Sequence, residues 1–166
     1  MSISIARRTF RVAALALVCG LATASARADG AFSHLAGAWS GTGTISFNSG
    51  SRERIRCRAN YATGEGGTVL RLDLRCASDS YKFELRSNLS AAGGSISGTW
   101  SEITRSVSGS VTGTANGTAI NVTAISPTFS AFLAVNTRGN RQSISIQSPG
   151  SEMNEVAIAL ARGGRR

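Results

Sequence analysis

The sequence predicts an all-β domain, and three observations lead to this prediction. Between residues 38 and 161, about ten short segments alternate apolar with polar residues at a period of two. Turns rich in Gly, Asn, Ser and Pro separate the segments. No segment after residue 28 has helical periodicity. We expect one antiparallel up-and-down barrel of about 8–10 strands, because closure removes sheet edges; a β-sandwich is the alternative.

Residues 1–28 have the features of a cleavable signal peptide. Arg7, Arg8 and Arg11 form a basic region before the apolar run 12–21, which is shorter than the roughly 20 residues that a membrane-spanning helix needs. The segment 6–10 also resembles a twin-arginine export signal, and an ordinary signal remains equally open. Cleavage is expected after Ala28, which predicts a periplasmic or secreted protein without a transmembrane span in the mature chain.

Removal of this segment changes the charge and the cysteine count. The remaining 138 residues contain 14 Arg plus Lys and 9 acidic residues, so the net charge falls from +9 to +5. This length suits a single domain with one core. Two cysteines remain, the even number expected of an exported protein with one disulfide.

The N-terminal half of the predicted domain begins with a lead-in and a hairpin. Residues 29–37 are a lead-in that is either helical or irregular, and strands start at Ala38. After a turn at 48–51, strands 52–62 and 68–77 are joined by the Gly-rich turn 63–67. Pairing Cys57 with Cys76 also places apolar residues opposite one another. The sequence therefore predicts a cross-strand disulfide, worth about 3 kcal/mol for a loop of about 20 residues.

Alternation and turn residues define the remaining strands in order. Residues 81–89 follow a turn at 78–80 and end before the turn 92–94. The Asn116-Gly117 pair is typical of a tight hairpin. Further strands are expected around residues 96–100, 107–111, 120–124, 129–135, 144–146 and 156–160. The barrel domain is therefore predicted to span 38–161, followed by a Gly/Arg tail at 162–166.

Two short stretches resemble the calycin barrels, which include lipocalins and avidins. Residues 35–41 contain a Gly-x-Trp sequence similar to the one that opens the first strand in those families, and Ser97-Gly98-Thr99-Trp100 is similar to avidin strands. A weaker likeness is to periplasmic metalloprotease-inhibitor barrels, which place such a strand before a hairpin disulfide. The chain as a whole resembles exported proteins of Gram-negative bacteria. The resemblance implies a barrel but assigns no biotin-contacting or protease-contacting residues.

Cations gather on the outward face of the predicted hairpin. Its register sets Arg58 opposite Arg75, and a tight turn at 78–79 would set Arg75 opposite Lys82 and Arg71 opposite Arg86. Like charges across a sheet cost stability, which suggests an anionic lipid or polyanion as partner. A solvated face that guards against aggregation is the favoured alternative, and nucleic acid is not expected because no aromatic residues lie among the arginines. The candidate anion-binding face comprises Arg56, Arg58, Arg71, Arg75, Lys82 and Arg86.

The inward face has aromatic residues separated by glycines, which suggests a cavity for a hydrophobic ligand. Small barrels are also filled by their own side chains, and strand glycines also mark bends. We weigh a filled core above a ligand cavity. The candidate cavity residues are Trp39, Tyr61, Phe83, Trp100 and Phe129.

Catalytic and metal sites are not predicted. His34 is the single histidine, the cysteines are expected to be bonded, and Glu53 and Glu102 lie near strand ends where exposure is expected. No catalytic residue, metal or cofactor is therefore assigned. The sequence predicts a non-enzymatic exported barrel that binds a small hydrophobic or anionic ligand through its interior or its Arg-rich face. A periplasmic protease inhibitor or other protein-interaction module is the alternative.

Overall fold

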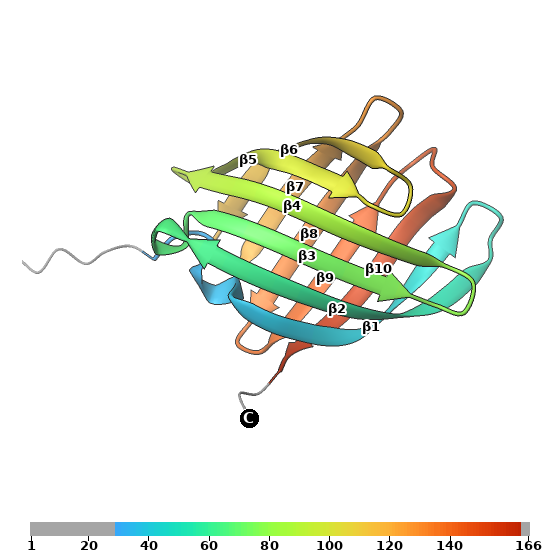
Figure 1. Ribbon diagram of the computed structural model, residues 1–166, viewed down its shortest axis with the longest axis horizontal. Coiled ribbons are helices and arrows are strands. Elements are labelled where there is room, and N and C mark those ends of the chain that lie inside the picture. Colours follow the sequence, from blue (N-terminus) through green and yellow to red (C-terminus); the bar gives the residue numbers. More distant parts are fainter. Residues whose placement is uncertain (1–28, 164–166) are drawn as a thin grey trace, which may run out of the picture.

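The computed structural model describes residues 29–163 and contains a closed antiparallel barrel (Figure 1). Every strand pairs with its neighbours in the sequence, and the last strand pairs with the first. The strands are β1 (Gly37–Phe47), β2 (Arg52–Gly64), β3 (Val69–Ala77), β4 (Lys82–Ala92), β5 (Ser95–Glu102), β6 (Val107–Asn116), β7 (Ala119–Ile125), β8 (Ser130–Arg138), β9 (Arg141–Gln147) and β10 (Met153–Arg162). The predicted up-and-down barrel is confirmed, and the sandwich alternative is wrong.

Alternation of residue type explains why these segments form a closed sheet. In β2, the buried residues Ile55, Cys57, Ala59 and Tyr61 alternate with exposed polar residues. Successive side chains of a strand point to opposite faces, so one face of each strand supplies the core and the other the outer wall. Closure pairs β1 with β10 and leaves no unpaired sheet edge.

The hairpin of β2 and β3 has the predicted register. Cys57 lies opposite Cys76, and the two sulfurs form a disulfide across the strands. Tyr61 lies opposite Leu72, as the alignment of apolar residues requires. Both cysteines are only 2% exposed, so the disulfide is part of the core.

The predicted register between β3 and β4 is wrong by two residues. Arg75 lies opposite Glu84, and Asp73 lies opposite Arg86. The cause is the connection at 78–81, which is longer than the tight turn assumed: the backbone N–H of Ser78 donates to the carbonyl of Tyr81 at 2.7 Å. Cations therefore face acids between these strands, and the predicted like-charge pairs Arg75–Lys82 and Arg71–Arg86 do not form.

A short helix covers one end of the barrel. The lead-in contains a 3-10 helix, η1 (Ser33–Leu35), and Phe32 and Leu35 are buried in the core. The backbone N–H of Phe32 donates to the carbonyl of Gly67 in a second 3-10 helix, η2 (Glu65–Gly67), between β2 and β3. The indole N–H of Trp39 donates to the carbonyl of Leu35 at 2.8 Å. These bonds hold η1 against the barrel end.

Arg162 also secures this end and was wrongly assigned to the tail. It is the last residue of β10, and its guanidinium lies 4.6 Å from the centre of the Trp39 ring. The same guanidinium donates to the carbonyl of His34. The last strand and the lead-in are thereby joined.

Among residues 29–163, no helix is long and apolar enough to cross a membrane. The predicted signal peptide at 1–28, and the tail beyond residue 163, lie outside the described residues.

Candidate ligand-binding site

The barrel encloses a cavity of about 310 Å³, lined by inward-facing side chains from every strand except β1. The lining is mostly aliphatic and aromatic. The side chains of the described residues therefore do not fill the interior completely. An eight-stranded barrel is just wide enough for its side chains to fill, and the diameter grows with the number of strands. Ten strands leave space that Leu, Val and Ala residues do not occupy.

Four of the five predicted aromatic residues line this cavity. Tyr61, Phe83, Trp100 and Phe129 all border it, and the rings of Trp100 and Phe129 lie 5.9 Å apart. Trp39 does not border it. Its ring is buried beneath η1, where it meets Tyr61 edge-on, so it helps to close the barrel end.

The cavity opens at the end opposite η1. Of its lining residues, Arg105 and Glu152 are exposed, and they lie in the β5–β6 and β9–β10 connections. At the other end the lining residues Phe32 and Leu35 are buried. We call the end around Arg105 and Glu152 the mouth. It is on the right in Figure 1, where these connections lie. The alternation of apolar and polar residues predicts strands, and it does not indicate that residues in these two connections border a cavity.

Glu102 lines the cavity near the mouth. Its side chain is mostly buried, whereas the sequence predicted that it is exposed. Its carboxylate accepts backbone N–H bonds from Glu84 at 2.9 Å, Thr104 at 3.1 Å and Arg105 at 2.6 Å. Burial alone raises the pKa of Glu102, but these N–H bonds outweigh it and hold the pKa below its ordinary value. The ionised carboxylate therefore fixes the β5–β6 connection in place.

Arg105 lies at the entrance with a partly free guanidinium. It approaches Glu102 at 3.7 Å, is 43% exposed at its side chain, and lies 4.4 Å from the centre of the Tyr81 ring. Backbone N–H groups already occupy acceptor positions of the Glu102 carboxylate, and the guanidinium also donates to the carbonyl of Lys82 at 3.4 Å. Tyr81 and Arg105 thus form one side of the mouth.

Polar groups inside the barrel are few. Ser87 is buried at 7% exposure in β4 and borders the cavity between Leu85 and Leu89. Its hydroxyl is on a residue that lines the cavity, between two leucines. A second polar group deep in the barrel is the phenol of Tyr61, which donates to Gln142 Oε1 at 2.7 Å. Ser87 therefore places a hydroxyl-bearing residue in the cavity wall.

The predicted anion-binding residues are only partly brought together. Arg75 forms a salt bridge with Glu84 at 3.6 Å, and Arg86 forms one with Asp73 at 3.2 Å. Arg71 faces Asn88 across the sheet, so it is not opposite another cation. Arg56, Arg58, Arg75 and Lys82 border one shallow hollow on the outer wall. Two of the six residues, Arg75 and Arg86, are therefore paired with acids, and four border a common hollow.

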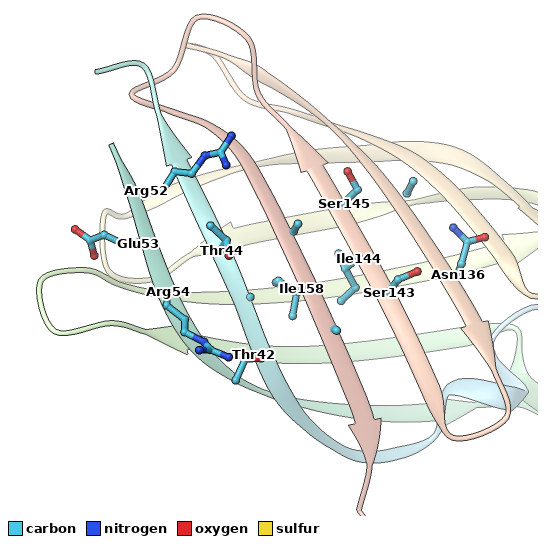
Figure 2. Close-up of a pocket in the computed structure, with 14 residues that line it drawn as sticks. Thr42, Thr44, Arg52, Glu53, Arg54, Asn136, Ser143, Ile144, Ser145 and Ile158 are labelled. Carbon is cyan, nitrogen blue, oxygen red and sulfur yellow. The ribbon is translucent and has the colours of Figure 1, made fainter. Parts of the chain in front are cut away.

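A second outer hollow lies over β8, β9, β10, β1 and β2 (Figure 2). It is lined by small or hydroxyl-bearing side chains, with arginines at one side. Figure 2 shows Arg52 and Arg54 on β2 beside Thr42 and Thr44 of β1. The arginines at this border, Arg52 and Arg54, were not among the predicted site residues. The sequence could have indicated them, because arginines occupy every second position from Arg52 to Arg58.

Comparison with known proteins shows likeness in fold alone. No family model matches the chain, and no curated protein matches it in sequence. The crystal structure of Rv2717c from M. tuberculosis is similar with a TM-score of 0.65 and 17% identity, over 81% of this chain and 96% of that one. The S-type phycobiliprotein lyase CPES from Guillardia theta is similar with a TM-score of 0.58 and 8% identity, over 81% and 92% of the two chains. These barrels are consistent with the calycin-like architecture expected from the sequence.

Proposed function

We propose that this protein binds a small, mainly hydrophobic molecule inside its barrel and acts as a binding protein without catalysis. The observation that carries the proposal is the apolar cavity inside the barrel, with exposed lining residues at the mouth. Small-molecule sites are typically concave and mostly apolar, with volumes from about 300 to 1,000 Å³, and this cavity lies at the lower end of that range. Burial of apolar ligand surface supplies the binding free energy.

Two polar groups set the orientation of the ligand. Ser87 offers one hydroxyl in an otherwise apolar stretch of wall, so a ligand with a hydrogen-bonding group at that depth satisfies it. Arg105 places a positive charge at the mouth. We therefore propose a ligand with an apolar body and a polar end that remains near Arg105.

A non-enzymatic role fits the chemistry of the cavity. The carboxylate of Glu102 accepts three backbone N–H bonds, which makes it a structural group and a weak base. The lyase that shares the fold acts, by its name, on phycobiliproteins, but a likeness at 8% identity supports only the architecture.

We further propose that the protein works in the periplasm or outside the cell. The buried Cys57–Cys76 disulfide is typical of an oxidising compartment, and the basic and apolar segments within residues 1–28 are typical of a signal peptide. N-terminal sequencing of the protein recovered from a periplasmic extract tests this. A mature N-terminus at Asp29 is expected, and an intact Met1 in the cytosolic fraction would contradict it.

The binding proposal is tested with N-phenyl-1-naphthylamine, a neutral apolar dye that fluoresces when it leaves water. Ala131 is inward-facing and lines the cavity, so Ala131→Phe should fill space and raise the Kd for the dye at least tenfold. Ala134 is on the same strand and borders the outer hollow, so Ala134→Phe should leave the Kd within about twofold.

Circular dichroism of both variants checks that the barrel is intact. Absence of dye binding by the unmodified protein, or an equal effect of the two substitutions, would contradict a ligand site in the cavity.

A further inference from the structure

We propose a second binding site, separate from the cavity: the outer wall along β2 binds a linear acidic polysaccharide. The site is built on Arg52, Arg54, Arg56 and Arg58, which we call the arginine row. These residues are at successive outward positions of β2, and all four are exposed. Positions two apart on a strand are about 7 Å apart, so the row presents four positive charges in a line of roughly 20 Å.

The arginine row is not neutralised within the protein. Among residues 29–163, no carboxylate lies within 4.0 Å of these four guanidiniums; the salt bridges of the described chain involve Arg75, Arg86 and Arg105. On the β1 side, the row faces hydroxyl-bearing residues: Ser46, Thr44, Thr42 and Ser40. On the β3 side, Arg56 faces Ala77 and Arg58 faces Arg75.

Four acids lie near the row: Glu53, Asp79, Glu84 and Glu155. Glu84 forms its salt bridge with Arg75, and Glu155 lies one strand beyond Ser46, which faces Arg52. Glu53 is on β2 itself, but its carboxylate accepts hydrogen bonds from the hydroxyls of Ser78 and Ser80. Asp79 shares a hollow with Arg52, Arg54 and Arg56 but forms no salt bridge with them. None of these acids forms a salt bridge with the four arginines of the row; the salt bridges of the described residues are those of Arg75, Arg86 and Arg105.

Protection against aggregation does not account for the row. Cations commonly guard unpaired sheet edges, but β2 is paired on both sides in a closed barrel. The same sheet places acids opposite cations between β3 and β4, and it does not do so along β2. Like charges at neighbouring positions cost stability, and an anionic ligand offsets that cost.

The hollow beside the row favours a polysaccharide over other polyanions. Thr42, Thr44, Ser143, Ser145 and Asn136 border it, together with Glu53, and Figure 2 shows Ser143, Ser145 and Asn136 across the hollow from the arginines. Hydroxyl and amide groups are suited to hydrogen bonds with sugar hydroxyls. The remaining wall there includes Ala157 and Ala159, which leave room for a polymer to approach the sheet.

The same surface is poorly suited to nucleic acid or to a membrane. Single-stranded nucleic acid is bound by aromatic side chains that stack on bases, and none borders this hollow. The exposed large apolar residues of the described chain are Ile103, Ile125 and Phe132. Phe132 is on β8, four strands from β2, or roughly 19 Å around the wall at about 4.8 Å per strand.

The experiment measures binding of the mature chain to a heparin dodecasaccharide at 150 mM salt by isothermal titration calorimetry. The Arg54→Gln/Arg56→Gln variant should bind at least tenfold more weakly than the unmodified protein. The matched control is Arg138→Gln/Arg141→Gln, which removes two exposed cations that face each other at the β8–β9 turn. Both variants have the same net charge, so the control should bind within twofold of the unmodified protein.

Further ligands separate the outcomes. Neutral dextran should not bind, and a polygalacturonate oligosaccharide should bind and lose affinity in the Arg54→Gln/Arg56→Gln variant. Equal loss in both double variants would show a net-charge effect and overturn the site. Equal or tighter binding of a dT12 oligonucleotide or of dioleoylphosphatidylglycerol vesicles would overturn the polysaccharide assignment. Arg54→Lys/Arg56→Lys, which keeps the charge, should restore most of the affinity.

Discussion

At the scale of single residues, Tyr61 combines an apolar surface with a polar group that needs a partner. Its ring borders the cavity and meets Trp39 edge-on, while its phenol donates to Gln142 Oε1. Gln142 in turn donates to Thr137 Oγ1 at 3.1 Å, so this deep network is satisfied. Buried polar groups are tolerated when they are hydrogen-bonded in this way.

Tyr61→Phe is expected to lower the free energy of unfolding at pH 7 by about 1–3 kcal/mol, because Gln142 Oε1 loses its donor in a buried site. Burial raises the pKa of the Tyr61 phenol above its ordinary value near 10, and the bond to Gln142 only partly opposes this. Stability from this group is therefore complete below about pH 10. Above it, the unfolded chain loses a proton that the folded chain keeps, so stability falls by up to ~1.4 kcal/mol per pH unit.

Urea denaturation between pH 7 and 11 measures both effects. In the Tyr61→Phe variant, the free energy of unfolding should fall less steeply at alkaline pH than in the unmodified protein. Tyr81→Phe should change this slope less, because Tyr81 is only half-buried. An alkaline decline that is unchanged in Tyr61→Phe would contradict the role of this phenol.

At the scale of strands, alternation was sufficient to predict ten strands, and the cysteines were sufficient to predict one register. In the β2–β3 pairing, two constraints select the same register: the two cysteine sulfurs must be close enough to bond, and the apolar residues of the two strands must face one another. The β3–β4 pairing had no such constraint. Its register depended on the length of the 78–81 connection, which is fixed by a backbone bond and the Ser78 hydroxyl. A sequence pattern does not reveal that bond, so the charge pairing along these strands was predicted wrongly.

Glycines allow the strands to approach closely as the sheet curves. A Cβ atom at Gly109, opposite Trp100, would lie 1.7 Å from the carbonyl oxygen of Ile125 on the next strand. Gly109→Ala should therefore force the β6–β7 ladder apart and lower the free energy of unfolding by about 1–3 kcal/mol or more. At Gly64, the nearest atom to an added Cβ is 4.0 Å away, so Gly64→Ala should be neutral or stabilising by about 0.4–1 kcal/mol.

Thermal and urea unfolding of the two alanine variants measures this contrast. A Gly109→Ala variant as stable as the unmodified protein would show that the ladder can shift at no cost, and would remove the reason given for glycine at this position.

At the scale of the whole molecule, the sequence indicated a cavity and a filled core as alternatives but did not decide between them. The alternation of apolar and polar residues shows which side chains point inward. It placed Tyr61, Phe83 and Trp100 correctly on the inner face. Whether they fill the interior depends on the barrel diameter, which follows from the number and tilt of all strands together. The mouth residues Arg105 and Glu152 belong to connections, which have no alternation to follow.

The disulfide acts on the whole chain through its unfolded state. Every strand is already paired on both sides, so the Cys57→Ala/Cys76→Ala variant should fold into the same barrel. It should be less stable by about 3 kcal/mol, because the unfolded chain is no longer restricted by a cross-link between two residues that are 19 apart in the sequence. Urea midpoints with equal slopes measure the difference, and equal midpoints would contradict it. With both sulfurs buried, the unmodified protein should be reduced by dithiothreitol only as fast as it opens.

Closure of one end by η1 gives the interior the properties of a blind tube. In the proposed function, a ligand that enters at the mouth would reach no further than Phe32 and Leu35. Any portion too long for the chamber protrudes past Arg105 into water, where it gains no further apolar contact. Across a homologous series of alkyl compounds, affinity should therefore rise with each added carbon up to one chain length and then level off. That length would report the depth of the cavity.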